Sequence, residues 1–169
     1  DKADVYAETI RNITPADIDA AGRIGGSIKL IGTYKATDDG ISVYVCPQIV
    51  GSSNALSAVN DVYNAISVTC DITGDVMFYG RGAGKLPTAS AVVADMIDCA
   101  KHLEARKYLS WEDGSDNYVD TSLDEYGKMY VSLKSDNFEK LTEQFNTIFT
   151  DCDSYVKNQY RNEIAFITQ

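Results

Sequence analysis

The feature that most constrains the fold is a glycine-rich segment, Gly80-Arg81-Gly82-Ala83-Gly84, between an apolar tetrapeptide and a helical pattern. Val76 to Tyr79 is apolar or aromatic at every position, which is typical of a central strand buried on both faces. Apolar residues then recur at helical spacing from Pro87 to about Ala105. The pattern predicts a buried strand, a glycine loop and a helix in direct succession.

From the residues alone, the glycine loop has two interpretations. Gly80, Gly82 and Gly84, with Thr88 in the first turn of the helix, can line a cofactor or substrate site, because glycine lets a backbone approach a ligand and a helix N-terminus attracts anions. The same residues also suit a tight strand-to-helix turn without a ligand. The spacing is neither G-x-G-x-x-G nor a P-loop, so both interpretations stay open at this point.

The residues before the loop predict an α+β fold with a mixed or antiparallel sheet and helices on one face. Thr14, Pro15 and Asp17 have the pattern of a capping box that starts a helix, and Gly25-Gly26 ends it. Residues 47–53 are expected to form a connection, and residues 54–63 a helical turn or a loop. The expected strands are Val5–Ile10, Ser27–Tyr34, Ile41–Cys46 and Asn64–Cys70, and the turn residues Asp38-Asp39-Gly40 predict that the second and third form a hairpin.

The end of the chain has a different organisation, with the predicted order β-α-β-β. Residues 106–127 contain few aliphatic side chains and are expected to form a linker. Strands are expected at Met129–Lys134, Ser154–Tyr160 and Ile164–Thr168. Between the first two strands, an apolar stripe at helical spacing predicts an amphipathic helix whose phenylalanines are core residues; its members are Phe138, Leu141, Phe145 and Ile148.

Charge and cysteine usage exclude several classes of protein. The formal net charge of −10 argues against nucleic acid or an anionic membrane as the main partner. No apolar run approaches the length of a transmembrane helix, and the sequence has no signal-peptide pattern. Four irregularly spaced cysteines and one histidine form no zinc-ligand pattern, and we expect reduced, mostly buried thiols in a cytosolic protein: Cys46, Cys70, Cys99 and Cys152.

A few other polar side chains could carry chemistry, but each also has an ordinary explanation. The lysines could bind phosphate or act in catalysis, or could simply be solvated. The aspartates, three residues apart on a helix, could hold a metal or form a solvated face. The histidine lies near a helix C-terminus, where its interaction with the helix dipole is favourable. These residues are Lys29, Lys35, Lys85, Asp95, Asp98 and His102.

Several stretches together resemble homoserine dehydrogenase over residues 3–105. The resemblance includes Ile10–Thr14 and Ile28–Gly32, and it is strongest at Gly74–Gly84 and Pro87–Asp95, which match in order and in spacing. Thr9 stands where that family usually has glycine. No departure falls within the glycine loop.

The resemblance implies an oxidoreductase that uses NAD or NADP to interconvert L-homoserine and L-aspartate 4-semialdehyde, in threonine, methionine and isoleucine biosynthesis. Residues 1–107 then form the later part of a catalytic (substrate) domain. The dinucleotide domain and the catalytic lysine of the family come earlier, so no catalytic residue and no metal ligand is assigned here. The glycine loop carries over as the cofactor-binding element, with Gly82 as its best single residue. We expect a cytoplasmic homodimer, and a chain that is inactive by itself.

Residues 128–169 resemble the first part of an ACT domain, a ferredoxin-like regulatory fold, with residues 108–127 as the linker. In homoserine dehydrogenases such a unit is associated with control by threonine. Ser135-Asp136-Asn137-Phe138 stands where the ACT ligand loop usually has aspartate and glycine. The alternative to an enzyme fragment is a regulatory or dimerisation module that binds an amino-acid effector.

Overall fold

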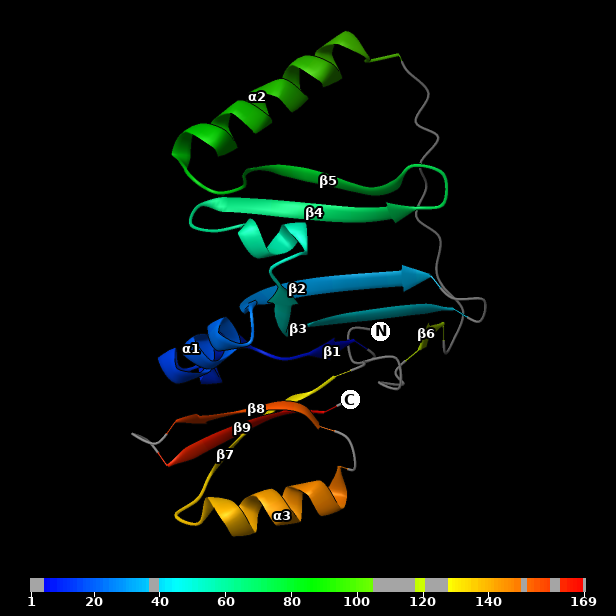
Figure 1. The fold of residues 1–169 in the computed structure, drawn as a ribbon. Helices are drawn as coiled ribbons and strands as arrows, with labels where there is room; N and C mark the ends of the chain where they lie inside the picture. Colours follow the sequence, from blue (N-terminus) through cyan, green and yellow to red (C-terminus); the bar gives the residue numbers. More distant parts are fainter. Residues whose placement is uncertain are drawn as a thin grey trace. The chain divides into compact units, whose positions relative to one another are not determined.

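The computed structural model describes residues 5–36, 40–104, 118–120, 128–149, 152–158 and 162–168. They form two compact units, which we name by their place in the chain. The split unit comprises Asp1–Ser52 and Asp116–Gln169, and the inserted unit comprises Ser53–Ser115. The described residues contain three separate sheets and three α-helices, so the expected α+β composition is confirmed (Figure 1).

The first sheet of the split unit is mixed, with order β1-β3-β2 and with β6 also paired to β3. Its strands are β1 (Tyr6–Ala7), β2 (Gly26–Ala36), β3 (Ile41–Gly51) and β6 (Val119–Asp120). β2 and β3 form the predicted hairpin, and β1 and β6 pair with β3 in parallel. β6 lies within the segment 106–127 that was expected to be a linker; residues 106–117 and 121–127 of that segment lie outside the described residues.

Two predictions about this sheet are wrong. The expected strand Val5–Ile10 is reduced to β1, because a 3₁₀ turn begins at Ile10 and the Thr9 side chain accepts the Arg11 N–H. The expected connection after Cys46 is instead strand, since β3 continues to Gly51. Proline is tolerated at position 47 because β1 pairs with β3 only at Tyr44 and Val45, so no ladder bond on that side needs its N–H.

Helix α1 (Pro15–Arg23) starts as the sequence predicts. The Asp17 N–H donates to Thr14 Oγ1 at 3.3 Å, and the Thr14 N–H donates back to Asp17 Oδ2 at 2.8 Å. This reciprocal pair satisfies two of the N–H groups that a helix start leaves without partners. After α1, Gly25 has φ +77°, a conformation that favours glycine and turns the chain into β2.

The inserted unit contains a 3₁₀ turn at Ala55–Ala58, the two-stranded sheet β4 (Tyr63–Cys70) with β5 (Gly74–Arg81), and helix α2 (Lys85–Lys101). The prediction that Val76–Tyr79 is buried on both faces is wrong. β5 pairs with β4 alone among the described strands, and no residue from Ser53 to Glu104 is buried. Phe78 is 64% exposed. The tetrapeptide is therefore apolar without being covered by other elements of its own unit.

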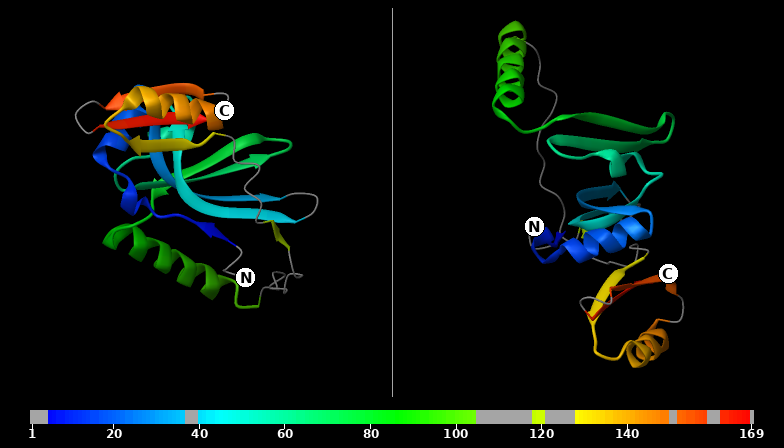
Figure 2. Two further views of the ribbon diagram at one scale, coloured as in Figure 1. Left: turned by 90° about the horizontal axis from the view of Figure 1, so that it is seen from below. Right: turned by 60° about the vertical axis from the view of Figure 1, so that its left-hand side comes forward.

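The C-terminal sheet has the strand order β7-β9-β8, all antiparallel, with α3 between β7 and β8 in the chain (Figure 2). The elements are β7 (Tyr130–Lys134), α3 (Phe138–Ile148), β8 (Cys152–Asn158) and β9 (Glu163–Thr168). The predicted β-α-β-β order is confirmed.

The core of the C-terminal sheet is formed by Phe145 of α3 against Ile164 and Phe166 of β9. The Phe145 and Phe166 rings stack with centroids 3.8 Å apart. Phe138, Leu141 and Phe149 pack around this cluster, as the apolar stripe predicts. Ile148 is the exception, at 74% exposed, because ten residues after Phe138 it has rotated to the rim of the stripe.

Candidate functional site

The glycine loop joins β5 to α2 as expected, and its candidate residues Gly80, Gly82, Gly84 and Thr88 are all exposed. Gly84 is the N-cap residue of α2, with φ +120° and ψ 152°, and no side chain caps the helix there. The Thr88 N–H donates to the Gly84 carbonyl at 3.1 Å, so Thr88 lies in the first turn, although α2 begins two residues earlier than predicted. The N–H groups of an uncapped first turn can receive an anionic or polarised ligand.

Gly82 lies against the side chain of Asn64 on β4. A Cβ at position 82 would come within 2.4 Å of Asn64 Nδ2, whereas a Cβ at Gly80 would meet nothing within 4 Å. Gly82 is therefore the loop position at which close approach requires glycine. The sequence pattern alone gives the three glycines equal weight.

An aromatic stack lies beside the loop, and sequence reasoning missed it. The rings of Tyr63 and Tyr79 stack with centroids 4.8 Å apart and an interplanar angle of 8°. The guanidinium of Arg81 lies over the Tyr63 ring, 5.5 Å from its centroid, in a cation–π contact. Arg81 is in register with Tyr63, so the β4–β5 pairing brings a positive charge to the entrance of the loop. The one sequence feature that could have indicated a charged contact here is the position of Arg81 between Gly80 and Gly82.

The other polar candidates do not gather at this loop. Lys29 and Lys35 lie on β2 in the split unit, whereas Lys85 is the first residue of α2. Asp98 on α2 pairs with the C-cap residue His102, whose Nδ1 is 3.1 Å from Asp98 Oδ1. Within the described ranges, no three histidine, cysteine or acidic side chains are grouped to hold a metal ion.

Of the cysteines, Cys46, Cys70 and Cys99 are free thiols. The expectation of mostly buried thiols is wrong for these three, since Cys46 and Cys70 are half-buried and Cys99 is exposed on α2. Burial raises the pKa of the Cys46 thiol. The side chain of Cys152 lies outside the described residues.

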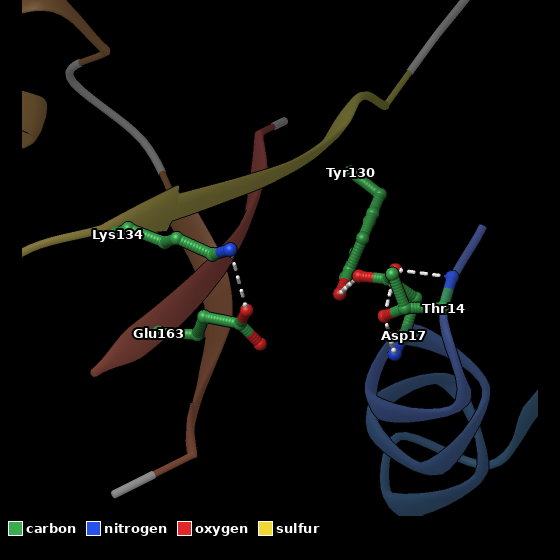
Figure 3. A network of polar contacts seen from close by, with 5 residues as sticks. All are labelled: Thr14, Asp17, Tyr130, Lys134 and Glu163. Atoms are coloured by element: carbon green, nitrogen blue, oxygen red, sulfur yellow. Dashed lines mark hydrogen bonds and ion pairs between the residues drawn. The ribbon is translucent and has the colours of Figure 1, made fainter. Parts of the chain in front are cut away.

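A second polar cluster, not predicted from the sequence, lies in the split unit (Figure 3). The Tyr130 hydroxyl donates to Asp17 Oδ1 at 2.9 Å, across 113 positions of sequence. Burial, followed by the hydrogen bond to Asp17, raises the pKa of Tyr130 well above its usual value, so the phenol stays protonated as a donor. On the same strand, Lys134 Nζ lies 3.5 Å from Glu163 Oε1.

Comparison with known proteins identifies the family. The family model described as homoserine dehydrogenase matches residues 1–97. The chain belongs to the homoserine dehydrogenase family. The homoserine dehydrogenase of Neisseria gonorrhoeae is 45% identical over 100 residues, and that of Corynebacterium glutamicum is 44% identical over 104 residues. Each alignment covers 59% of this chain and 23% of the relative, so the chain matches less than a quarter of their length.

Solved homoserine dehydrogenase structures extend the similarity to the C-terminal sheet. The Staphylococcus aureus enzyme superposes with a TM-score of 0.69 at 31% identity, over 99% of this chain and 42% of that one. The Thiobacillus denitrificans enzyme gives a TM-score of 0.75 at 25% identity, over 100% and 41% of the two chains. Homoserine dehydrogenases are dinucleotide-dependent oxidoreductases. Over the described part of the chain, no helix is both long and apolar enough to cross a membrane.

Proposed function

We propose that this chain supplies the glycine-loop side of the cofactor site in a homoserine dehydrogenase that oxidises L-homoserine to L-aspartate 4-semialdehyde. The observation that carries the proposal is the exposed loop Gly80–Gly84 at the uncapped start of α2, within the part of the chain that matches the family. The residues fit a nicotinamide dinucleotide, because Gly82 allows close approach and the α2 amides offer hydrogen-bond donors. NAD or NADP bound at this loop would supply the hydride acceptor for the oxidation of the substrate, whose alcohol proton would be released.

In this proposal, the residues of the chain bind and orient rather than react. Gly82 and Gly84 shape the loop, and Thr88 lies in the first turn behind it. Arg81 and the tyrosine stack fix the β5 end of the loop. The residue that accepts the proton is not assigned to this chain, and the chain alone is expected to show no turnover.

A segment exchange tests the proposal. Residues 1–97 would replace the matching segment of the N. gonorrhoeae homoserine dehydrogenase, and homoserine-dependent reduction of NAD or NADP would be followed spectroscopically, with the parent enzyme and the isolated chain as controls. We expect turnover by the exchanged enzyme and none by the isolated chain. A folded exchanged enzyme without turnover would contradict the proposed function.

Within that exchanged enzyme, Gly82→Ala is expected to lower kcat/KM about tenfold, because small displacements at a reacting centre are costly. Gly51→Ala is the matched control, since a Cβ there meets nothing within 4 Å. The double variant Gly82→Ala/Asn64→Ala removes the side chain that the new methyl group would meet. We expect it to remain impaired if the loop approaches the cofactor. Full recovery would show that Gly82 serves only to accommodate Asn64.

We further propose that residues 128–169 form an ACT-like fold and that L-threonine is its candidate effector. We also propose that the protein is a cytoplasmic homodimer. The strand order β7-β9-β8 with α3 is that of the first four elements of a ferredoxin-like fold, which supports the ACT-like assignment of residues 128–169. The exposed apolar side chains of β4, β5 and α2 support self-association; they include Ile66, Phe78 and Met96.

Light scattering and thermal unfolding of the chain, each with and without L-threonine, test this regulatory assignment. We expect a dimer and a threonine-dependent increase in Tm, because a ligand that binds only the folded state stabilises it. A monomer at every concentration, together with an unchanged Tm, would refute both assignments.

A further inference from the structure

The two faces of the C-terminal sheet have different partners. Alternation along β7 directs Val131 and Leu133 toward α3, and directs Tyr130 and Ser132 to the opposite face. Helix α1 lies on that second face, with the sheet between α1 and α3 (Figures 1 and 2). The C-terminal sheet is therefore covered on one side by its own helix and on the other by a helix from the family-matching part of the chain.

The contact with α1 combines polar and apolar residues, unlike the aromatic and aliphatic core against α3. A shallow pocket lies between α1 and the sheet, and every α1 residue that lines it is either alanine or charged. From the sheet, the same lining receives polar groups from Tyr130, Ser132 and Glu163 and apolar groups from Ile164 and Ala165. Helix α1 buries only the alanines Ala20 and Ala21, so its contact separates and re-forms more readily than an apolar core such as that around Phe145.

One carboxylate serves both sides of this contact. Asp17 Oδ2 accepts the Thr14 N–H at 2.8 Å and the Thr14 hydroxyl at 2.6 Å, which caps α1. Asp17 Oδ1 accepts the Tyr130 hydroxyl at 2.9 Å, which holds the sheet (Figure 3). The Tyr130 hydroxyl bonds to a charged acceptor in a partly buried position, where such hydrogen bonds are strongest.

We propose that Tyr130 and Asp17 form a reversible joint that couples docking of the C-terminal sheet to the N-terminal cap of α1. Tyr130 is thus a positioning residue for α1. When the sheet separates from α1, the carboxylate loses its Tyr130 donor and the cap loses the contact that fixes its orientation. Conversely, when the cap frays, Asp17 no longer presents Oδ1 to the sheet. This inference does not depend on the proposed enzymatic function.

The joint can reach further than α1, because the helix is tightly connected to the β2–β3 hairpin. At Gly26, a Cβ would come within 2.6 Å of the Ile49 side chain and 3.6 Å of the Ala21 carbonyl, so helix, turn and hairpin leave no room there. The Ser52 N–H also donates to the Gly25 carbonyl at 2.9 Å. A displacement of α1 is therefore passed to the end of β3, where the inserted unit begins in the chain.

Amide hydrogen exchange of the whole chain tests the joint. In Tyr130→Phe, which keeps the ring and removes the hydroxyl, we expect exchange to accelerate about tenfold at both ends of the joint, a change of about 1.4 kcal/mol. The reporters are the Ile18 N–H, bonded to Thr14, and the Thr168 N–H, bonded to Met129. Lys134→Ala is the matched control on the same strand, because its ion pair with Glu163 is exposed on the lysine side and contributes little.

Asp17→Asn and the double variant Tyr130→Phe/Asp17→Asn complete the test. Coupling is reciprocal, so Asp17→Asn must also accelerate exchange at Thr168, and adding Tyr130→Phe must then have little further effect there. Tyr130→Leu removes both the ring and the hydroxyl, so comparing it with Tyr130→Phe separates the effect of the ring from that of the hydroxyl. If Tyr130→Phe is silent while Tyr130→Leu accelerates exchange, Tyr130 acts by packing alone and the joint is refuted. Acceleration at only one of the two reporters also refutes it.

Discussion

Phe166→Ala is expected to lower the free energy of unfolding of the C-terminal sheet by about 3–5 kcal/mol. Phe166 is 1% exposed and stacks on Phe145, so the substitution removes a large buried ring and leaves a cavity between β9 and α3. The central position of β9 increases the effect, because β9 pairs with both β7 and β8. Urea unfolding followed by far-UV circular dichroism measures the change.

Ile148→Ala is the matched control for Phe166→Ala. Ile148 also belongs to the apolar pattern of α3, but it is exposed, so its truncation is expected to change the stability by less than about 0.5 kcal/mol. Equal losses for the two variants would contradict the assignment of the core to Phe145, Ile164 and Phe166.

Gly84→Ala is expected to destabilise the start of α2 by about 1–3 kcal/mol, because the combination of φ +120° and ψ 152° is accessible almost exclusively to glycine. The nearest atom to an added Cβ is Pro87 Cδ at 3.5 Å, an ordinary contact, so the penalty comes from the backbone conformation and not from crowding. Hydrogen exchange of the Thr88 amide, which is bonded to the Gly84 carbonyl, measures the destabilisation of the start of α2.

Gly51→Ala serves as the control for Gly84→Ala, since position 51 has open space and no positive φ. In the Gly51→Ala variant, the Thr88 amide is expected to exchange at the same rate as in the parent chain. If Gly84→Ala leaves the exchange of that amide unchanged, the loop adopts another conformation at position 84, and the geometry assigned to the candidate site is wrong.

The local elements could be predicted from short-range chemistry. The capping box at Thr14 and Asp17 depends on groups three residues apart, and the helical stripe of α3 depends on a period that the sequence displays directly. The glycine loop was also located correctly, because glycines between a strand pattern and a helix pattern have few other structural uses. Predictions failed where neighbours outside the local sequence decide the outcome. Val76–Tyr79 reads as a buried strand, but burial depends on what covers a strand and not on its own composition.

In the candidate site, too, the local sequence predicted the loop, whereas contacts between strands decided the surroundings of its residues. The sequence identified three glycines and Thr88, and the family resemblance favoured Gly82, but the contact of Gly82 with Asn64 arises only when β4 pairs with β5. The stack of Arg81 on Tyr63 has the same origin. Strand register brings together residues that are more than a dozen positions apart, and that register is set by the turn between β4 and β5 rather than by the residues of the glycine loop.

The sequence by itself determined the N-terminal cap of α1, the β2–β3 hairpin, the β-α-β-β order of the C-terminal part and the resemblance to homoserine dehydrogenases, since each is recorded in residues close together in the chain. Only the tertiary structure showed that α1 and the C-terminal sheet belong to one compact unit, and that Tyr130 reaches Asp17. The physical reason is that a hydroxyl and a carboxylate 113 positions apart meet only after two elements have formed and docked, a step that depends on the surfaces both elements present once folded.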